Sequence, residues 1–309
     1  MGNDATSYSF EDSEQNFLNT YNLTEIPNVF THEDVIISSF LLMISLFGLL
    51  GNGTVIRLLG FHMKRNSFTI YILNLAVADF AVLIALMLRA IDVILIAHQE
   101  SLNLIVMVAF GIIFFFMYNT SQLLLTAISI ERCVAVWFPI WHQCHRPPKL
   151  STIVCALIWV LSLILCGIHI IVIAAGCDPL VHAIVTILIC YPLMATSTLT
   201  LFVKICFTQK KQKRTKTLTV ILLALLFCLI FGIPPAIYTV FVYYHGFRLV
   251  LTFENIVCLC ACLNSSINPM LYFFAGRGKK VQSRVSLRDR LQRVFFDEQD
   301  HREGEGPPD

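Results

Sequence analysis

Seven long apolar stretches dominate the chain, and the connections between them are short. Each stretch holds the roughly 20 apolar residues that a helix needs to cross a bilayer. They cover residues 35–59, 69–96, 102–130, 150–173, 179–203, 217–243 and 249–274. Charged residues make up 14% of the chain, against about 25% in an average soluble domain. The sequence therefore predicts an all-α membrane protein, a seven-transmembrane helix bundle. Strands of a membrane barrel would instead alternate over about ten residues.

Basic residues lie almost entirely on one side of the predicted bundle. Of the 22 Lys and Arg residues, only Arg89 and Arg248 fall on the other side. Short cytoplasmic connections retain Lys and Arg, which places the N-terminus outside the cell and the C-terminus in the cytoplasm. We therefore expect a multi-pass protein of the plasma membrane. No apolar stretch precedes residue 35, so the first span would itself serve as the membrane anchor.

The extracellular side is strongly acidic. Residues 1–34, expected to form an extracellular tail, hold seven acidic residues and no Lys or Arg. Asp92, Glu100, Asp178 and Glu254 add to them, which gives the outer side a formal charge of −9. A negative mouth concentrates cations, so a basic peptide or a small cation is favoured as ligand. In the tail, Asn22 begins an Asn-Leu-Thr sequon and is the candidate glycosylation site.

Two polar motifs interrupt the apolar pattern. Asn268-Pro269-x-x-Tyr272 lies in the last stretch, where the proline frees a backbone carbonyl and leaves the helix bendable. Neighbouring polar groups or water must then bind that carbonyl. Glu131-Arg132 ends the third stretch. Taken alone, an acid and a base at a helix end are ordinary membrane-interface residues.

Polar, tryptophan or proline residues recur from stretch to stretch: Asn52, Asp79, Glu131-Arg132, Trp159, Pro192, Pro234 and Asn268-Pro269. This set resembles the rhodopsin-like (class A) G-protein-coupled receptors over about residues 35–296. Within that class the chain is most similar to the Mas-related receptor family. The likeness is carried by Ile-Tyr-Ile-Leu-Asn-Leu-Ala-Val-Ala-Asp79, Leu-Leu-Thr-Ala-Ile-Ser-Ile-Glu-Arg-Cys133, Phe-Pro-Ile-Trp-His-Gln-Cys-His-Arg-Pro148 and the Asn-Ser-Ser-Ile-Asn-Pro269 segment.

The resemblance implies a receptor that transmits the binding of an extracellular ligand to a heterotrimeric G protein and to arrestin. Arg132, in its motif with Glu131, would engage the G protein, and Ile140 would dock against it. Tyr272, in its motif with Asn268 and Pro269, would swing inward on activation.

Asp79 is a carboxylate in the middle of a predicted span, where a charge is costly and persists when it is buried, paired or functional. Ser121, Asn264, Ser265 and Asn268 supply neutral oxygen atoms. By resemblance these five residues line a sodium site that stabilises the inactive receptor. One carboxylate among neutral oxygens is also suited to hold water or a proton, so these alternatives stay open. Apart from this candidate sodium ion, we expect no metal or cofactor.

Two departures from the class pattern bear on activation. Gly232 stands two residues before Pro234, where most of the class carries Trp, so the usual aromatic switch cannot operate. Arg214 and Lys216 replace an acid at the cytoplasmic end of the sixth stretch, so no ion pair between spans can hold Arg132 inactive. We therefore expect appreciable activity without ligand.

The cysteines depart from the class pattern as well. None precedes Arg132, so the usual bridge from the third span to the second outer loop cannot form. Cys166 and Cys177 resemble the pair that joins the fourth and fifth spans of Mas-related receptors. If the fourth helix ran unbroken through Ala175, the two residues would lie about 15 Å apart, beyond the limit of about 7 Å. This candidate disulfide therefore requires a break near Gly167.

The second outer loop is very short, because Asp178-Pro179 reads as the start of the fifth span. We therefore expect a wide, shallow ligand pocket. Its candidate residues are Arg89, Asp92, Phe114, Tyr118, His169, Asp178, Tyr238 and Glu254, with packing at the membrane interface as the alternative for each. Phe114 stands where receptors for biogenic amines carry an aspartate, which argues against an aminergic ligand.

The C-terminal part divides at residue 296. Residues 276–296 are expected to form an amphipathic eighth helix on the membrane lipids of the inner leaflet, with Leu287, Leu291 and Phe295 among arginines. Residues 297–309 form the cytoplasmic tail and contain no Ser, Thr or Tyr. With so few phosphorylation sites, we expect arrestin to bind weakly.

Other classes of membrane protein fit the sequence less well. A retinal pump needs a lysine in the last span, and residues 249–274 contain none. An intramembrane enzyme would need paired aspartates, His-Glu-x-x-His or an activated serine, and none is present in the sequence, so no enzyme activity is expected. No nucleic-acid partner is expected either. A transporter or channel remains the alternative, without inverted repeats to favour it. A receptor-like protein that does not signal also stays open, because Cys133 and Gly232 both depart from the usual motifs.

Overall fold

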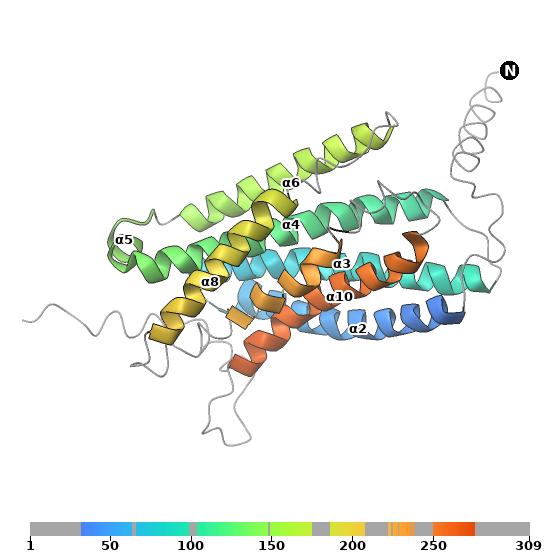
Figure 1. Cartoon of the computed structure of the whole chain (residues 1–309), viewed down its shortest axis with the longest axis horizontal. Helices are drawn as coiled ribbons and strands as arrows, with labels where there is room; N and C mark the ends of the chain where they lie inside the picture. The colour runs from blue at the N-terminus through green and yellow to red at the C-terminus, as the bar shows by residue number, and fades with distance from the viewer. Residues whose placement is uncertain are drawn as a thin grey trace, which may run out of the picture.

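The computed structural model describes residues 32–63, 66–98, 104–147, 149–174, 186–207, 222–223, 225–227, 229–235, 237 and 250–275. Its helices are α2 (His32–Arg57), α3 (Ser67–Ala97), α4 (Leu104–Trp137), α5 (Pro139–Cys144), α6 (Leu150–Ala174), α8 (Tyr191–Phe207) and α10 (Val250–Ala275) (Figure 1). A π-helical turn, η2 (Leu58–His62), follows α2, and a second one, η3 (Thr186–Cys190), precedes α8. The described positions of the sixth predicted stretch, between residues 222 and 237, are helical as well.

The prediction of an all-α membrane protein is confirmed. Among the described residues, five helices are long and apolar enough to cross a bilayer, and no strand occurs. These helices are His32–His62, Ser67–Ala97, Val108–Trp137, Leu150–Val172 and Glu254–Phe273. The predicted eighth helix at 276–296 and the tail before residue 32 lie outside the described residues.

Helix α4 runs well beyond the predicted end of its span at residue 130. It continues to Trp137, and its end is set by Pro139 rather than by the first charged residues. Phe138 precedes that proline and has left the helical conformation, with φ −122° and ψ 61°. A residue before proline disfavours the helical region for steric reasons. The predicted apolar stretch therefore ended before the helix does.

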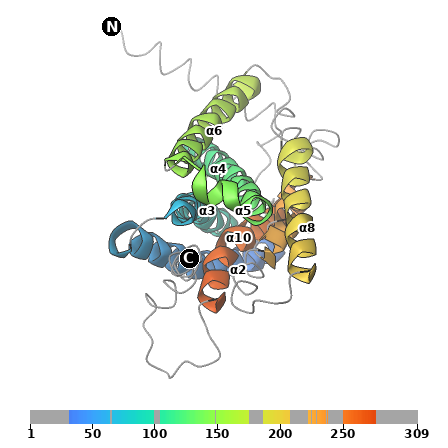
Figure 2. The same ribbon diagram turned by 90° about the vertical axis from the view of Figure 1, so that its left-hand side faces the viewer.

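Helix α3 occupies the middle of the bundle. It packs against α2, α4, α6 and α10, while α4 in turn contacts α6 and α8. Seen end-on in Figure 2, α3 and α4 lie between α6, α8, α10 and α2. The two ends of the bundle are named below by the residues that they hold. The Arg132 end is where α4 ends and α5 follows, and the Arg89 end is where α3 ends and α10 begins.

The interior consists of two apolar clusters with a polar layer between them. The cluster nearer the Arg132 end includes Leu75, Leu124 and Tyr272, and the other includes Val82, Tyr118 and Cys262. On α3, α4 and α10 the residues between these positions include fully buried Asp79, Ser121 and Ser265. On the outside, large apolar side chains are exposed, among them Phe47 and Leu50 of α2 and Leu157 and Ile171 of α6. Such outward-facing apolar surface suits lipid rather than water.

Candidate functional site

The polar layer is organised around Asp79. Ser121 Oγ donates a hydrogen bond of 2.7 Å to Asp79 Oδ1, and Asn268 Nδ2 donates one of 2.9 Å to Asp79 Oδ2. Asn264, one turn before Asn268 on α10, is 1% exposed, and Ser265 is fully buried. The amide oxygens of Asn264 and Asn268 have no hydrogen-bond partner among the described residues. The structure thus joins α3, α4 and α10 through one carboxylate and leaves oxygen acceptors beside it.

Pro269 lies inside α10 and removes one backbone donor from that helix. The carbonyl four residues earlier is that of Ser265, and Asn52 Nδ2 of α2 donates to it at 3.0 Å. The same Nδ2 also donates to the carbonyl of Gly48 at 3.1 Å. The helices are close here, since a Cβ on Gly48 would lie 2.7 Å from Leu83 Cδ1 of α3. Asn52 thus donates to the carbonyl that Pro269 leaves without a helical partner. In the sequence only its place in a motif marked it.

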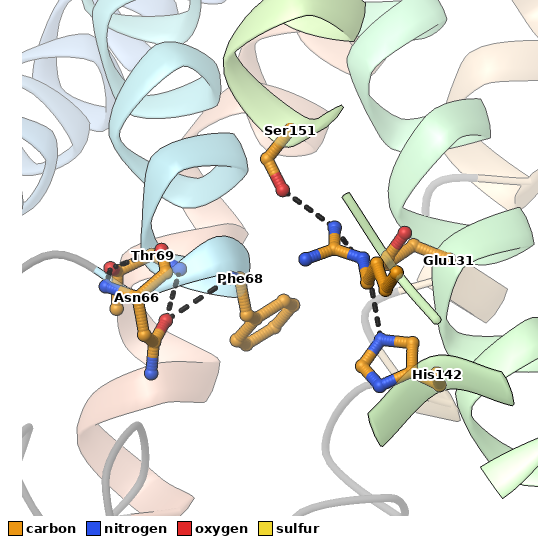
Figure 3. Close-up of polar contacts among 7 residues, drawn as sticks. Asn66, Phe68, Thr69, Glu131, His142 and Ser151 are labelled. Carbon is orange, nitrogen blue, oxygen red and sulfur yellow. Dashed lines mark hydrogen bonds and ion pairs between the residues drawn. The ribbon is translucent and has the colours of Figure 1, made fainter. Parts of the chain in front are cut away.

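Arg132 is buried near the end of α4 and lies over an aromatic ring. Its Cζ is 3.4 Å from the centroid of the Phe68 ring in the first turn of α3. A capping box fixes that turn, because Asn66 Oδ1 accepts from the backbone N–H groups of Phe68 and Thr69 at 3.1 and 2.8 Å (Figure 3). Tyr272 is buried in the same apolar cluster as Phe68. Nothing in the sequence marked Phe68 for a role, because its contact with Arg132 joins two helices.

Glu131 faces in another direction from Arg132. Its Oε1 accepts hydrogen bonds from His142 Nε2 at 2.9 Å and from an Arg146 guanidinium N–H at 2.8 Å. The same Arg146 nitrogen donates to Ser151 Oγ at 2.7 Å. Figure 3 shows Glu131 and His142 facing one another, with Ser151 at the start of α6 nearby. Ile140, on the same short helix as His142, is 75% exposed.

At the Arg89 end, charged and polar groups of three helices meet. Arg89 of α3 and Glu254 of α10 form an ion pair of 2.7 Å. Asn255 Nδ2 of α10 donates to Asp34 Oδ1 of α2. Asp92, one turn after Arg89, is partly buried. An ion pair that is partly exposed adds only about 0–1 kcal/mol to stability.

The aromatic candidates at this end fall into two separate pairs. Phe114 stacks on Tyr118 with the ring centroids 5.5 Å apart, and both belong to the apolar cluster of the Arg89 end. His169 of α6 stacks instead on Phe115, at 3.8 Å. Neighbouring residues of a helix point about 100° apart. The structure therefore places His169 on a different face of α4 from the Phe114–Tyr118 pair.

Four predicted site residues, Asn22, Cys177, Asp178 and Tyr238, lie outside the described residues. Cys166 is a free, buried thiol within α6. That helix continues past Gly167 to Ala174 without the break that the bridge was expected to require, and with Cys177 outside the described residues the bridge itself stays a prediction.

The space next to Gly232 is filled from two other helices. Tyr191 Oη of α8 donates a hydrogen bond to the Gly232 carbonyl. A Cβ on Gly232 would lie 3.2 Å from Tyr191 Cε1 and 3.4 Å from Gln122 Oε1. The absence of Trp was visible in the sequence, whereas the two side chains that occupy the site depend on how the helices pack.

The chain is similar to known receptors over most of its length. Residues 51–179 match the family model described as "7 transmembrane receptor (rhodopsin family)". The protein named Proto-oncogene Mas from Rattus norvegicus is 36% identical over 288 residues, which cover 89% of each chain. Mas-related G-protein coupled receptor member X1 from Homo sapiens is 36% identical over 282 residues, covering 85% of this chain and 84% of the relative. Member D from Macaca fascicularis is 34% identical over 293 residues, covering 88% and 89% respectively.

Proposed function

The chain belongs to the Mas-related G-protein-coupled receptors of the rhodopsin family, and we propose that it transmits the binding of an extracellular ligand to a heterotrimeric G protein. The G protein would bind at the Arg132 end. Membership in the family makes the chain a multi-pass membrane receptor with a seven-helix bundle.

The arrangement at the Arg132 end carries this proposal. Arg132 is 5% exposed, and its guanidinium group lies over the Phe68 ring. A small movement of α4 or α3 would therefore expose this cation to a protein that binds at the Arg132 end. A cation over an aromatic ring gains about 0.5–2 kcal/mol, which a docking protein can replace. At the same end of the bundle, Ile140 of α5 offers an exposed apolar contact. A buried arginine and an exposed apolar side chain at one end of the bundle suit a protein partner.

We test this in cells by measuring ligand-free activation of each G-protein subtype by the intact chain and by Arg132→Ala, at matched surface levels. Arg57→Ala is the control, because Arg57 is an exposed basic residue at the same end of the bundle. We expect Arg132→Ala to abolish signalling and Arg57→Ala to preserve it. If the parent chain is silent, the same comparison is made with a panel of cationic peptides. Signalling that survives Arg132→Ala, or silence under every condition, would overturn the proposal.

The ligand is proposed to be cationic and to enter at the Arg89 end, with that end extracellular and the receptor in the plasma membrane. Two features of the sequence support this: the distribution of Lys and Arg, and the formal charge of −9 on the predicted outer side. Glu254 and Asp92 offer carboxylates to such a ligand, since the first is only partly buried in its pair with Arg89.

The polar layer around Asp79 is proposed to hold a sodium ion. The donor set fits, because the Asp79 carboxylate lies with Ser121 and Asn268, and the amide oxygens of Asn264 and Asn268 have no partner among the described residues. Hard cations prefer such oxygen ligands. When bound, the ion would neutralise the buried carboxylate and hold α3, α4 and α10 together.

A further inference from the structure

An ion pair between Arg89 and Glu254 joins α3 to α10 at the Arg89 end of the bundle. Arg89 Nη2 lies 2.7 Å from Glu254 Oε1, and the two side chains remain 24% and 30% exposed. A guanidinium group suits a carboxylate well, because it is planar and presents several N–H donors. The chain therefore already holds a guanidinium group on the Glu254 carboxylate, in a position that is partly open to solvent.

Helix α10 has other contacts that hold it in place at this end. Asn255 is 4% exposed and donates a hydrogen bond to Asp34 of α2. Ala90 of α3 and Cys258 of α10 are buried together in the apolar cluster of the Arg89 end. These contacts do not depend on whether the ion pair is closed. Exchange of one cation for another on the carboxylate therefore needs only a side-chain movement, and no movement of α10.

Arg89 has a second carboxylate within reach. Asp92 follows it by three residues on α3 and is partly buried. Side chains three residues apart are neighbours on the surface of a helix. An arginine that leaves Glu254 can therefore pair with Asp92, which lowers the cost of displacing it.

We propose that Glu254 binds the cationic group of the ligand and that Arg89 is a built-in competitor for this carboxylate. The inference rests on the proposed function, in which the ligand is cationic and enters at the Arg89 end. The ligand presents a guanidinium group, such as an arginine side chain, in the place that Arg89 occupies. If Arg89 instead received a carboxylate of the ligand, removing its charge would weaken binding. The sign of the Arg89→Gln effect separates these two roles.

The strength of the ion pair sets the size of the effect. A pair that is partly exposed is closed about one to five times as often as it is open. A ligand that needs the open form is weakened by the fraction of the chain that is closed. Arg89→Gln leaves Glu254 open throughout, so the affinity for the ligand should rise about two- to sixfold. Glu254→Gln should lower it at least about tenfold, because a hydrogen bond between charged groups is lost.

The probe is a fluorescently labelled arginine hexamer with an amidated C-terminus, which carries no carboxylate. It is titrated onto the purified full chain in nanodiscs, without a G protein. The matched neutral probe is the citrulline hexamer, whose binding should change in neither variant. Arg248→Gln is the control for charge, because it removes one positive charge from the predicted outer side at a position outside the described residues. We expect it to raise the affinity less than Arg89→Gln does. In a Glu254→Gln background, the gain from Arg89→Gln should shrink to that of the control.

Three results would overturn the competition. The first is a lower affinity in Arg89→Gln, and the second is a gain no larger than that of Arg248→Gln. The third is a gain that persists undiminished in the Glu254→Gln background. Failure of the arginine hexamer to bind either the parent chain or Arg89→Gln would overturn the inference as well. None of these results decides the proposed coupling, because the Arg132→Ala comparison measures G-protein activation and not binding of this probe.

Discussion

Asp79 is a fully buried carboxylate near the middle of the α3 span. Burying a charge in this position is costly, and the two hydrogen bonds from Ser121 and Asn268 offset only part of that cost. Among the described residues the amide oxygens of Asn264 and Asn268, the amide nitrogen of Asn264 and the Ser265 hydroxyl have no hydrogen-bond partner, so this layer has polar atoms left to bind an ion or water. The carboxylate and these oxygens fit the proposed sodium site, and on that proposal an occupying ion should stabilise the folded receptor.

We expect sodium to raise the melting temperature of the purified receptor above its value in the same concentration of N-methylglucamine. A ligand at 100 times its dissociation constant adds about 2.7 kcal/mol. Asp79→Asn should remove the sodium dependence, because the amide has no charge to attract the ion. Ser162→Ala, which removes a buried hydroxyl of α6 outside the polar layer, is the control. An unchanged response in Asp79→Asn would place the ion elsewhere, and no response in the parent chain would favour water or a proton.

At the scale of single residues, the sequence predicted a functional residue well where one unusual side chain marks it. It predicted poorly where the role depends on a contact between residues of different helices. Asp79 was conspicuous because a carboxylate interrupts an apolar stretch. His142 and Arg146 were not, because their contact with Glu131 depends on the turn after Phe138. Phe68 looked like any other apolar residue at a span end, and its ring acquires a role only beneath Arg132.

At the scale of helices, α8 contacts the helix of the sixth stretch at Gly232, a position without a side chain. Tyr191 reaches the Gly232 carbonyl, and its ring lies where a side chain at position 232 would start. Gln122 of α4 closes the same space. A tryptophan at 232 is excluded by this packing. The sequence predicted the loss of the aromatic switch at this position, and the structure adds that Tyr191 is the aromatic residue that contacts it.

Gly232→Ala should destabilise the receptor by about 1–3 kcal/mol, because the new Cβ lies 3.0 Å from Tyr191 Oη and overpacks the contact. Tyr191→Phe should cost about 1 kcal/mol by removing the hydrogen bond. The two effects should not add in the double variant, since both act on one contact. Thermal unfolding of the purified variants measures these changes.

Gly167→Ala provides the matched control for this experiment. Gly167 also lies inside a helix, α6, but a Cβ there meets no atom of the described residues within 4 Å. Alanine is favoured over glycine in a helix by about 0.5–1 kcal/mol, so this variant should be neutral or more stable. Equal effects of the two substitutions, or full additivity of Gly232→Ala with Tyr191→Phe, would contradict the proposed contact.

The whole molecule follows from the bilayer constraint more directly than its details do. Every backbone group inside a membrane must be bonded, so long apolar stretches have to be helices, and their number and approximate bounds could be read from the sequence. The order in which helices pack could not, because lipid-facing and buried positions are both apolar. The resemblance to a family of known topology supplied what hydropathy lacks.

Charge separates the two sides of the molecule and leads to a kinetic prediction. A cationic peptide added to intact cells should associate faster at low ionic strength, because its attraction to the formal charge of −9 is screened by salt. Replacing Asp4, Glu11, Asp12 and Glu14 by their amides should weaken this salt dependence.

The matched control replaces Asp297, Glu298, Asp300 and Glu303, four acids at the other end of the chain. If the N-terminus is extracellular, the control should leave the association rate unchanged, because the four C-terminal acids then lie on the cytoplasmic side, away from the added peptide. A control that slows association as much as the N-terminal variant would contradict the orientation, and salt-independent association would contradict electrostatic attraction of the ligand.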